Sequence, residues 1–139
     1  MIFVDTNVII DVLQNDPIWA DWSITNLANA RAAGDVIINA MVIAELSRDH
    51  ATLDSLSRAI EPIGAIVDPI DEGVAFLAGQ RFVAARRHRG DSLSAHPLPD
   101  FFIAAHALRR NASVMTRDPR LFRRYFPELT LITPENDHG

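Results

Sequence analysis

The sequence predicts an α/β fold: one domain with a central parallel sheet and helices on both faces. Short apolar runs of strand length alternate along the chain with longer stretches of helical periodicity. Parallel strands are joined by right-handed crossovers, which place the intervening helices on the two faces of the sheet. The chain has no internal repeat, low-complexity tract or linker, so we expect a single domain over residues 1–139.

Five apolar runs are expected to form the strands because they are short and uncharged, as is typical of strands buried on both faces. They cover residues 2–4, 36–38, 65–67, 113–115 and 129–132. The helices are expected between them, at residues 8–13, 18–33, 40–47, 53–60, 73–89 and 101–110. Residues 86–99 carry charge, Gly, Ser and Pro, which predicts a loop before a helix that opens at Pro99 and Asp100.

The composition excludes several classes of protein. The net charge of -5 argues against a protein that coats nucleic acid by bulk attraction. All 13 basic residues are arginine, which excludes a P-loop lysine, a Schiff-base lysine and the lysine of response-regulator receivers. Arginine suits phosphate contacts, although a GC-rich genome explains the bias equally well. Cysteine is absent, so disulfides, thiolate zinc sites and cysteine nucleophiles are excluded.

Nothing in the sequence indicates a membrane or secreted protein. No apolar run reaches the roughly 20 residues that span a bilayer. The chain passes from Met1 directly into an apolar strand, without the basic and hydrophobic regions of a signal peptide. We therefore expect a cytoplasmic protein.

Four acidic residues are expected to meet at one edge of the sheet. Asp5 ends the first strand, Glu45 lies in the helix after the second, and Asp118 follows the fourth. Asp100 lies in the first turn of the helix that leads into the fourth strand. Crossover helices run antiparallel to the strands, so all four acids fall at the carboxyl edge, where open α/β folds place their ligands.

Three of these acids also have a structural explanation. Asp5 could cap the first helix, Asp100 could serve a helix dipole, and Asp118 before a proline is an ordinary helix start. Glu45 is harder to explain in this way, because its helix is apolar almost all round and a carboxylate buried alone is costly. The coincidence of all four therefore favours a functional site.

A divalent cation would relieve the repulsion among four carboxylates. Hard oxygen ligands suit Mg²⁺ or Mn²⁺, and such an ion can hold a phosphodiester and activate water. Thr6, Asn7 and Thr116 are placed to hydrogen-bond the ligating acids or the phosphate.

Four segments carry a recognisable pattern: VDTNVI at residues 4–9, IAEL at 43–46, PDFFIAAHA at 99–107 and TRD at 116–118. In their order and spacing these segments resemble the PIN domains, and most closely the VapC toxins of toxin–antitoxin pairs. It implies strand order 3-2-1-4-5, a homodimer, Mg²⁺- or Mn²⁺-dependent RNA cleavage, and inhibition by a cognate antitoxin in the active-site groove. The family's four acids carry over onto Asp5, Glu45, Asp100 and Asp118.

Several other side chains are candidates for contacts with RNA or a partner. The candidate RNA contacts are Arg86, Arg87, Arg89, Arg117 and Arg120, with Arg123 and Arg124 nearby; a solvated helix face and tail is the equal alternative. His96 and His106 are interpreted as surface or packing residues. Ile18, Trp19 and Trp22 are the candidate antitoxin-binding patch, the alternative being that both tryptophans pack on the neighbouring short helix.

Three other enzyme classes fit less well. A dehalogenase-type phosphatase needs a second acid where Asn7 stands, and both it and a receiver domain need a lysine. A dinucleotide-binding domain needs a Gly-rich turn after the first strand. Two alternatives within the PIN domains remain: an RNA-processing nuclease without an antitoxin, and a metal-binding interaction scaffold without turnover.

Overall fold

The computed structural model describes residues 1–89 and 98–135 and confirms the predicted α/β architecture. Its sheet has five parallel strands in the order β3-β2-β1-β4-β5. The strands are β1 (Ile2–Val4), β2 (Val36–Ile38), β3 (Ile66–Val67), β4 (Ser113–Met115) and β5 (Leu131–Ile132). The reversal of strand order falls between β1 and β4, which pair in parallel with Val4 opposite Met115.

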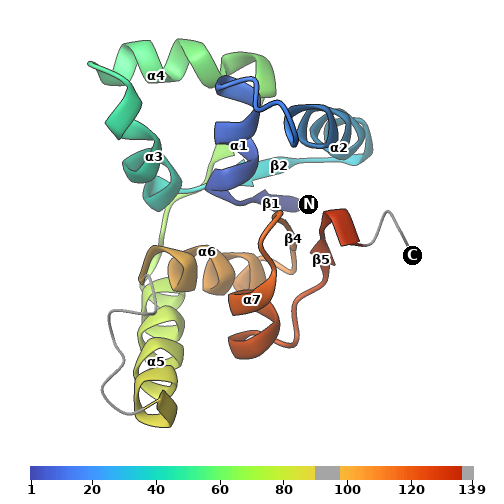
Figure 1. The fold of residues 1–139 in the computed structure, drawn as a ribbon. Helices are drawn as coiled ribbons and strands as arrows, with labels where there is room; N and C mark the ends of the chain where they lie inside the picture. The colour runs from blue at the N-terminus through green and yellow to red at the C-terminus, as the bar shows by residue number, and fades with distance from the viewer. Residues whose placement is uncertain (90–97, 136–139) are drawn as a thin grey trace.

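Helices cover both faces of this sheet (Figure 1). One layer holds α1 (Thr6–Leu13), α2 (Ala20–Ala33), α3 (Ala40–Leu46) and α4 (Leu53–Ile60), and the other holds α5 (Glu72–Arg89), α6 (Leu98–Arg109) and α7 (Arg120–Tyr125). Short 3-10 turns follow α3 and α4 at Ser47–Asp49 and Glu61–Ile63. The part of the chain that the structure describes contains no helix with the length and apolarity needed to cross a membrane.

The core lies on both sides of the central strands. Phe3 and Val4 of β1 and Val114 of β4 are buried completely, and Phe101 and Ile103 of α6 are buried in the same core. The burial of β1, β2 and β4 explains why these strands lack the alternating polar pattern of a half-exposed sheet. Because β1 and β4 are paired in parallel, their carboxyl ends lie side by side.

Several element boundaries differ from the predicted ones. The second helix begins at Ala20 rather than residue 18, because the Asp16 carboxylate accepts hydrogen bonds from the amides of Ile18 and Trp19 and forms a separate turn. Helix α6 begins at Leu98, before the predicted start. Within the predicted loop at residues 86–99, residues 86–89 belong to α5 and residues 90–97 lie outside the described part of the chain.

Candidate active site

Asp5 lies where β1 ends and α1 begins, and its carboxylate is held on both oxygens. Oδ1 accepts a hydrogen bond of 2.8 Å from the amide of Thr6, and Oδ2 accepts one of 2.8 Å from Thr116 Oγ1 and one of 3.3 Å from Asn7 Nδ2. The residue is only 5% exposed. Asp5 therefore caps α1, as the structural interpretation expected, and lines a pocket at the same time.

Glu45 projects from α3 toward the first turn of α1. Its Oε1 accepts a hydrogen bond of 2.7 Å from Thr6 Oγ1. In α3 only Val42 and Leu46 are buried, so the half-buried Glu45 lies at the edge of the core. Thr6 thus contacts two acids, one through its amide and one through its hydroxyl.

Asp100 and Asp118 approach the same space from the other half of the sheet. Asp100 lies in the first turn of α6, and Asp118 follows β4. The Asp118 amide donates to Thr116 Oγ1 over 3.1 Å, while its carboxylate accepts from Arg120 at 3.0 and 3.3 Å. Both acids therefore reach the carboxyl edge of the sheet, as the topology predicted.

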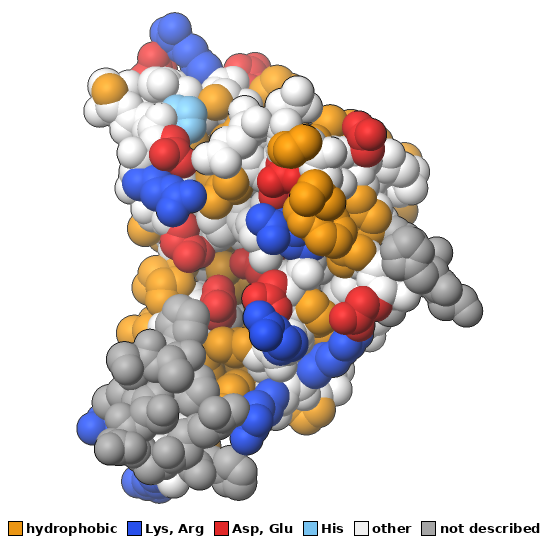
Figure 2. All heavy atoms as spheres, in the orientation of Figure 1, with side chains coloured by type: hydrophobic (Ala, Val, Ile, Leu, Met, Phe, Trp, Pro, Cys, Tyr) orange, Lys and Arg blue, Asp and Glu red, His pale blue; other side chains and the backbone are white. Residues whose placement is uncertain are grey.

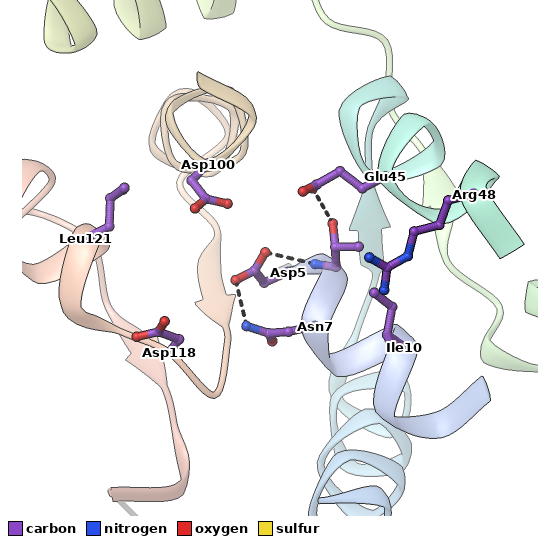
Figure 3. A pocket seen from close by; sticks show the side chains of 9 residues that line it. Asp5, Asn7, Ile10, Glu45, Arg48, Asp100, Asp118 and Leu121 are labelled. Carbon is purple, nitrogen blue, oxygen red and sulfur yellow. Dashed lines mark hydrogen bonds between the residues drawn. The ribbon is translucent and has the colours of Figure 1, made fainter. Parts of the chain in front are cut away.

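The four acids line one pocket of about 460 Å³. Figure 3 shows Asp5, Glu45, Asp100 and Asp118 around it, each from a different part of the chain. Its other lining residues are Thr6, Asn7, Ile10, Arg48 and Leu121. In the space-filling view, acidic side chains gather around a hollow in the middle of this face (Figure 2).

The pocket makes two of its carboxyl groups weaker acids than usual. Burial, with the charges of Glu45 and Asp118 as smaller causes, raises the pKa of Asp5 to about 6 despite its hydrogen bonds. Burial, followed by the charges of Asp5, Glu45 and Asp118, raises the pKa of Asp100 to about 7. The hydrogen bonds from Arg120 lower the pKa of Asp118. Negative charge at this site is therefore incompletely compensated by the protein.

The chemistry of this donor set fits a hard divalent cation. Carboxylate oxygens are the ligands that Mg²⁺ and Mn²⁺ prefer, and a cation would offset the repulsion that adds to the effect of burial on the two pKa values. Within residues 1–89 and 98–135, however, no three acidic or histidine side chains already stand close enough to enclose an ion.

The arginines expected to contact RNA have several different environments. Arg117 forms an ion pair with Asp11, and Arg120 forms one with Asp118. Arg86 and Arg87 are exposed on α5, whereas the side chain of Arg89 and the whole of His96 lie outside the described residues. Two more are engaged elsewhere, Arg123 with Glu135 and Arg124 over the ring of Tyr125.

Arg48 is a pocket residue that sequence analysis missed. It follows Glu45 by three residues, and its exposed side chain lies at the rim of the pocket (Figure 3). The spacing of three residues places both side chains on one side of the helical segment, a signal that the sequence did contain.

His106 is buried, in agreement with the packing role expected for it. Its Nε2 lies 2.6 Å from Asp68 Oδ2, and its Nδ1 lies 3.1 Å from Asn39 Nδ2. Asn39 also caps α3 through Oδ1, so this contact joins the helix that carries Glu45 to the helix that carries Asp100.

The three residues of the candidate antitoxin-binding patch are not equally accessible. Ile18 is 75% exposed, whereas Trp22 is partly buried and packs against the core. The Trp19 ring has the guanidinium of Arg117 5.8 Å from its centre. Ile18 is thus the most open member of the patch.

Residues 2–127 match the PIN domain family, and the chain belongs to this family. No curated protein matches its sequence. The fold is similar to that of VapBC2 from Rickettsia felis bound to a promoter DNA fragment (21% identity, 96% of this chain and 98% of that one, TM-score 0.73). It is also similar to FitAcB from Neisseria gonorrhoeae (26% identity, 97% of this chain and 99% of that one, TM-score 0.69). A third similar structure is DNA-bound VapBC from Salmonella typhimurium (24% identity, 95% of this chain and 96% of that one, TM-score 0.70).

Proposed function

We propose that this chain is a divalent-metal-dependent ribonuclease and the toxin of a toxin–antitoxin pair. The convergence of Asp5, Glu45, Asp100 and Asp118 in one pocket of a PIN domain is the observation that carries the proposal. Nuclease chemistry is the activity of VapC proteins, and similarity to VapBC complexes supports the toxin assignment. Residues 1–139 would form one PIN domain, and two copies of the chain would form a homodimer.

The residues of the pocket would hold the cation and orient its ligands. The four carboxylates would hold Mg²⁺ or Mn²⁺, with Thr6, Asn7 and Thr116 orienting Asp5 and Glu45 by the hydrogen bonds described above. When bound, such an ion polarises the phosphodiester and lowers the pKa of water. Asp5 and Asp100 must lose their protons to serve as ligands, since a protonated carboxyl binds a cation poorly.

Arg48 would bind a phosphate of the RNA beside the scissile one. It lines the rim of the pocket, and its side chain is 67% exposed; among residues 1–89 and 98–135, its one ion-pair partner is its neighbour Asp49. Such an exposed pair contributes little stability, so the guanidinium is free to exchange Asp49 for a phosphate. The exposed Arg86 and Arg87 on α5 are further candidates for contacts with the RNA backbone.

The test is cleavage of RNA by the purified chain with Mn²⁺, with Mg²⁺ and with EDTA. We expect cleavage with either ion, none with EDTA, and a loss of several orders of magnitude in Asp100→Asn. Arg58→Met is the surface control: Arg58 forms an exposed ion pair with Asp54 on α4, so this variant should cleave RNA normally. Undiminished cleavage in EDTA would falsify the metal-dependent mechanism, and Mn²⁺ binding without cleavage would favour a non-catalytic scaffold.

The antitoxin is proposed to inhibit through the acidic pocket. An arginine inserted among the four carboxylates would replace the cation, because a guanidinium supplies several donors to carboxylate oxygens. A reading frame for a small DNA-binding protein just upstream of this gene would support the toxin assignment. Its absence would favour an RNA-processing PIN nuclease instead.

A further inference from the structure

One ion pair, between a buried carboxylate and a partly exposed arginine, connects the turn that carries Asp118 to the first helix. Arg117 Nε donates to Asp11 Oδ2 over 2.7 Å, and the Asp11 side chain is 1% exposed. Ser23 Oγ on α2 donates to the same oxygen over 3.3 Å. A carboxylate so deeply buried requires a charged partner, so the Arg117 side chain is committed to Asp11.

The backbone of the same turn is also fastened to α1. The Arg117 amide donates to Asn7 Oδ1 over 3.4 Å, and Thr116 Oγ1 donates to Asp5 Oδ2 over 2.8 Å. Asn7 and Asp11 are four residues apart, which places them on one face of α1. Asn7 Nδ2 also donates to Thr116 Oγ1 over 3.3 Å, so four contacts with α1 and its cap hold residues 116–117, directly before Asp118.

We propose that Arg117 is a positioning residue: its pairing with Asp11 holds Asp118 at the acidic pocket, and it does not serve as an RNA contact. The inference rests on the proposed function, because Asp118 is taken as a metal ligand there. It replaces the sequence-based expectation that Arg117 binds RNA. Arg117 is not available to RNA because of this partner: if its guanidinium left Asp11 to bind a phosphate, the Asp11 carboxylate would stay buried without a charged partner.

Binding of Mn²⁺ to the full chain without RNA gives the first test. The Mn²⁺ affinity is measured by calorimetry, and Arg117→Met should lower it at least about tenfold. Removing a group that orients a metal ligand typically lowers metal affinity by about 10–100-fold. Arg58→Met, which removes an equal charge from the surface of α4, should bind Mn²⁺ like the parent. Equal affinity in the parent and a folded Arg117→Met protein would overturn the proposal, as would a parent that binds no Mn²⁺.

A second variant covers the case in which Arg117→Met does not fold. The double variant Asp11→Leu with Arg117→Met removes both charges, so no unpaired carboxylate stays buried. It should fold, yet bind Mn²⁺ about tenfold more weakly than the parent, because the turn has lost its link to α1. Parent-like Mn²⁺ affinity in this folded double variant would also overturn the proposal.

Steady-state kinetics separate positioning from RNA binding. A positioning role predicts a lower kcat and a higher half-saturating Mn²⁺ concentration, with KM for RNA changed less than about twofold and an unchanged salt dependence. A higher KM at constant kcat would instead identify Arg117 as an RNA contact and overturn the proposal. In that case the slope of log RNA affinity against log salt concentration would also fall in magnitude by about one. A parent that binds Mn²⁺ without cleaving RNA would refute the proposed function alone, since the Mn²⁺ affinities still decide the positioning role.

Discussion

The hydroxyl of Thr116 donates a 2.8 Å hydrogen bond to Asp5 Oδ2 across a sequence separation of 111 residues. The contact forms because β1 and β4 are neighbours in the sheet and end at the same edge. It favours the ionised form of Asp5, opposing the burial that raises the pKa of this group to about 6. If Asp5 is a metal ligand, as proposed, Thr116 helps set the pH at which it can act as one.

Replacing Thr116 with valine should move the acid limb of the pH–activity profile upward by about one pH unit. A hydrogen bond to a charged group contributes about 1.5–3 kcal/mol, and about 1.4 kcal/mol corresponds to one pKa unit. The measurement is kcat/KM against pH at one fixed Mn²⁺ concentration below saturation, where protons and Mn²⁺ still compete for Asp5. Thr116→Ser keeps the hydroxyl and serves as the control; an identical acid limb in valine and serine variants would contradict this role.

The free energy of unfolding in EDTA should fall as the pH rises from about 5 to about 7. Asp5 and Asp100 have raised pKa values, about 6 and about 7, so in this window the folded protein keeps protons that the unfolded chain has lost. Stability then decreases with rising pH and levels off above the folded-state pKa values. Asp118 and Asp68, whose pKa values are lowered, act on stability only at more acidic pH.

Asp100→Asn should therefore have a higher melting temperature than the parent at pH 8 in EDTA, and a flatter pH profile. The free energy of unfolding should rise by about 1–3 kcal/mol. This is less than the pKa shift of Asp100 alone implies, because the asparagine amide is still a polar group buried away from water. Thermal unfolding from pH 5 to 8 measures both. If Asp100→Asn melts well below the parent throughout, Asp100 is a structural residue.

Much of the fold and pocket could be predicted because topology determines it. Apolar runs identified the strands, and the antiparallel course of crossover helices placed Asp100 beside the ends of β1 and β4. Glu45 could be singled out because a carboxylate in an apolar helix needs a polar environment, which the Thr6 hydroxyl supplies in part.

Side-chain partners across long sequence separations could not be predicted. Nothing in the order of residues indicates that Arg117 pairs with Asp11 106 positions earlier. An arginine beside a catalytic motif has the same sequence signature whether it binds a phosphate or a buried carboxylate. Arg48 is a different case: it follows Glu45 by only three residues, so its place at the pocket could have been inferred from that spacing.

Asn39 should contribute more to stability than an ordinary helix cap. Its Oδ1 accepts from the amides of Met41 and Val42, which fixes the amide so that Nδ2 donates to His106 Nδ1. With Nδ1 accepting this bond, the Nε2–H of His106 is left to donate a hydrogen bond to Asp68 Oδ2. Asn39→Ala should cost about 2–3 kcal/mol, for the cap and the lost bond to buried His106 together.

Denaturant unfolding of two further variants separates these contributions. Asn39→Ser keeps a capping oxygen and should lose only about 1–2 kcal/mol. Thr52→Ala removes the exposed cap of α4 and should cost about 1 kcal/mol. Equal losses for Asn39→Ala and Thr52→Ala would show that the contact with His106 adds nothing.

Ile18→Ser should weaken binding of the cognate antitoxin by about tenfold while RNA cleavage by the free protein stays normal. Ile18 is 75% exposed, and burying such a side chain at an interface contributes about 1.4 kcal/mol or more. Trp22→Ala should instead lower stability, because Trp22 packs against the core. Trp19→Ala should disturb Arg117, whose guanidinium lies over the indole ring.

Antitoxin affinity, melting temperature and cleavage rate measured on the same preparations distinguish these three outcomes. Leu53→Ser is the matched control, since Leu53 is 68% exposed on α4, outside the patch, and should leave antitoxin affinity unchanged. If Ile18→Ser and Leu53→Ser bind the antitoxin equally well, Ile18 is not part of the interface. If Trp19→Ala keeps full activity and Mn²⁺ affinity, the Trp19–Arg117 contact is not needed to hold Asp118.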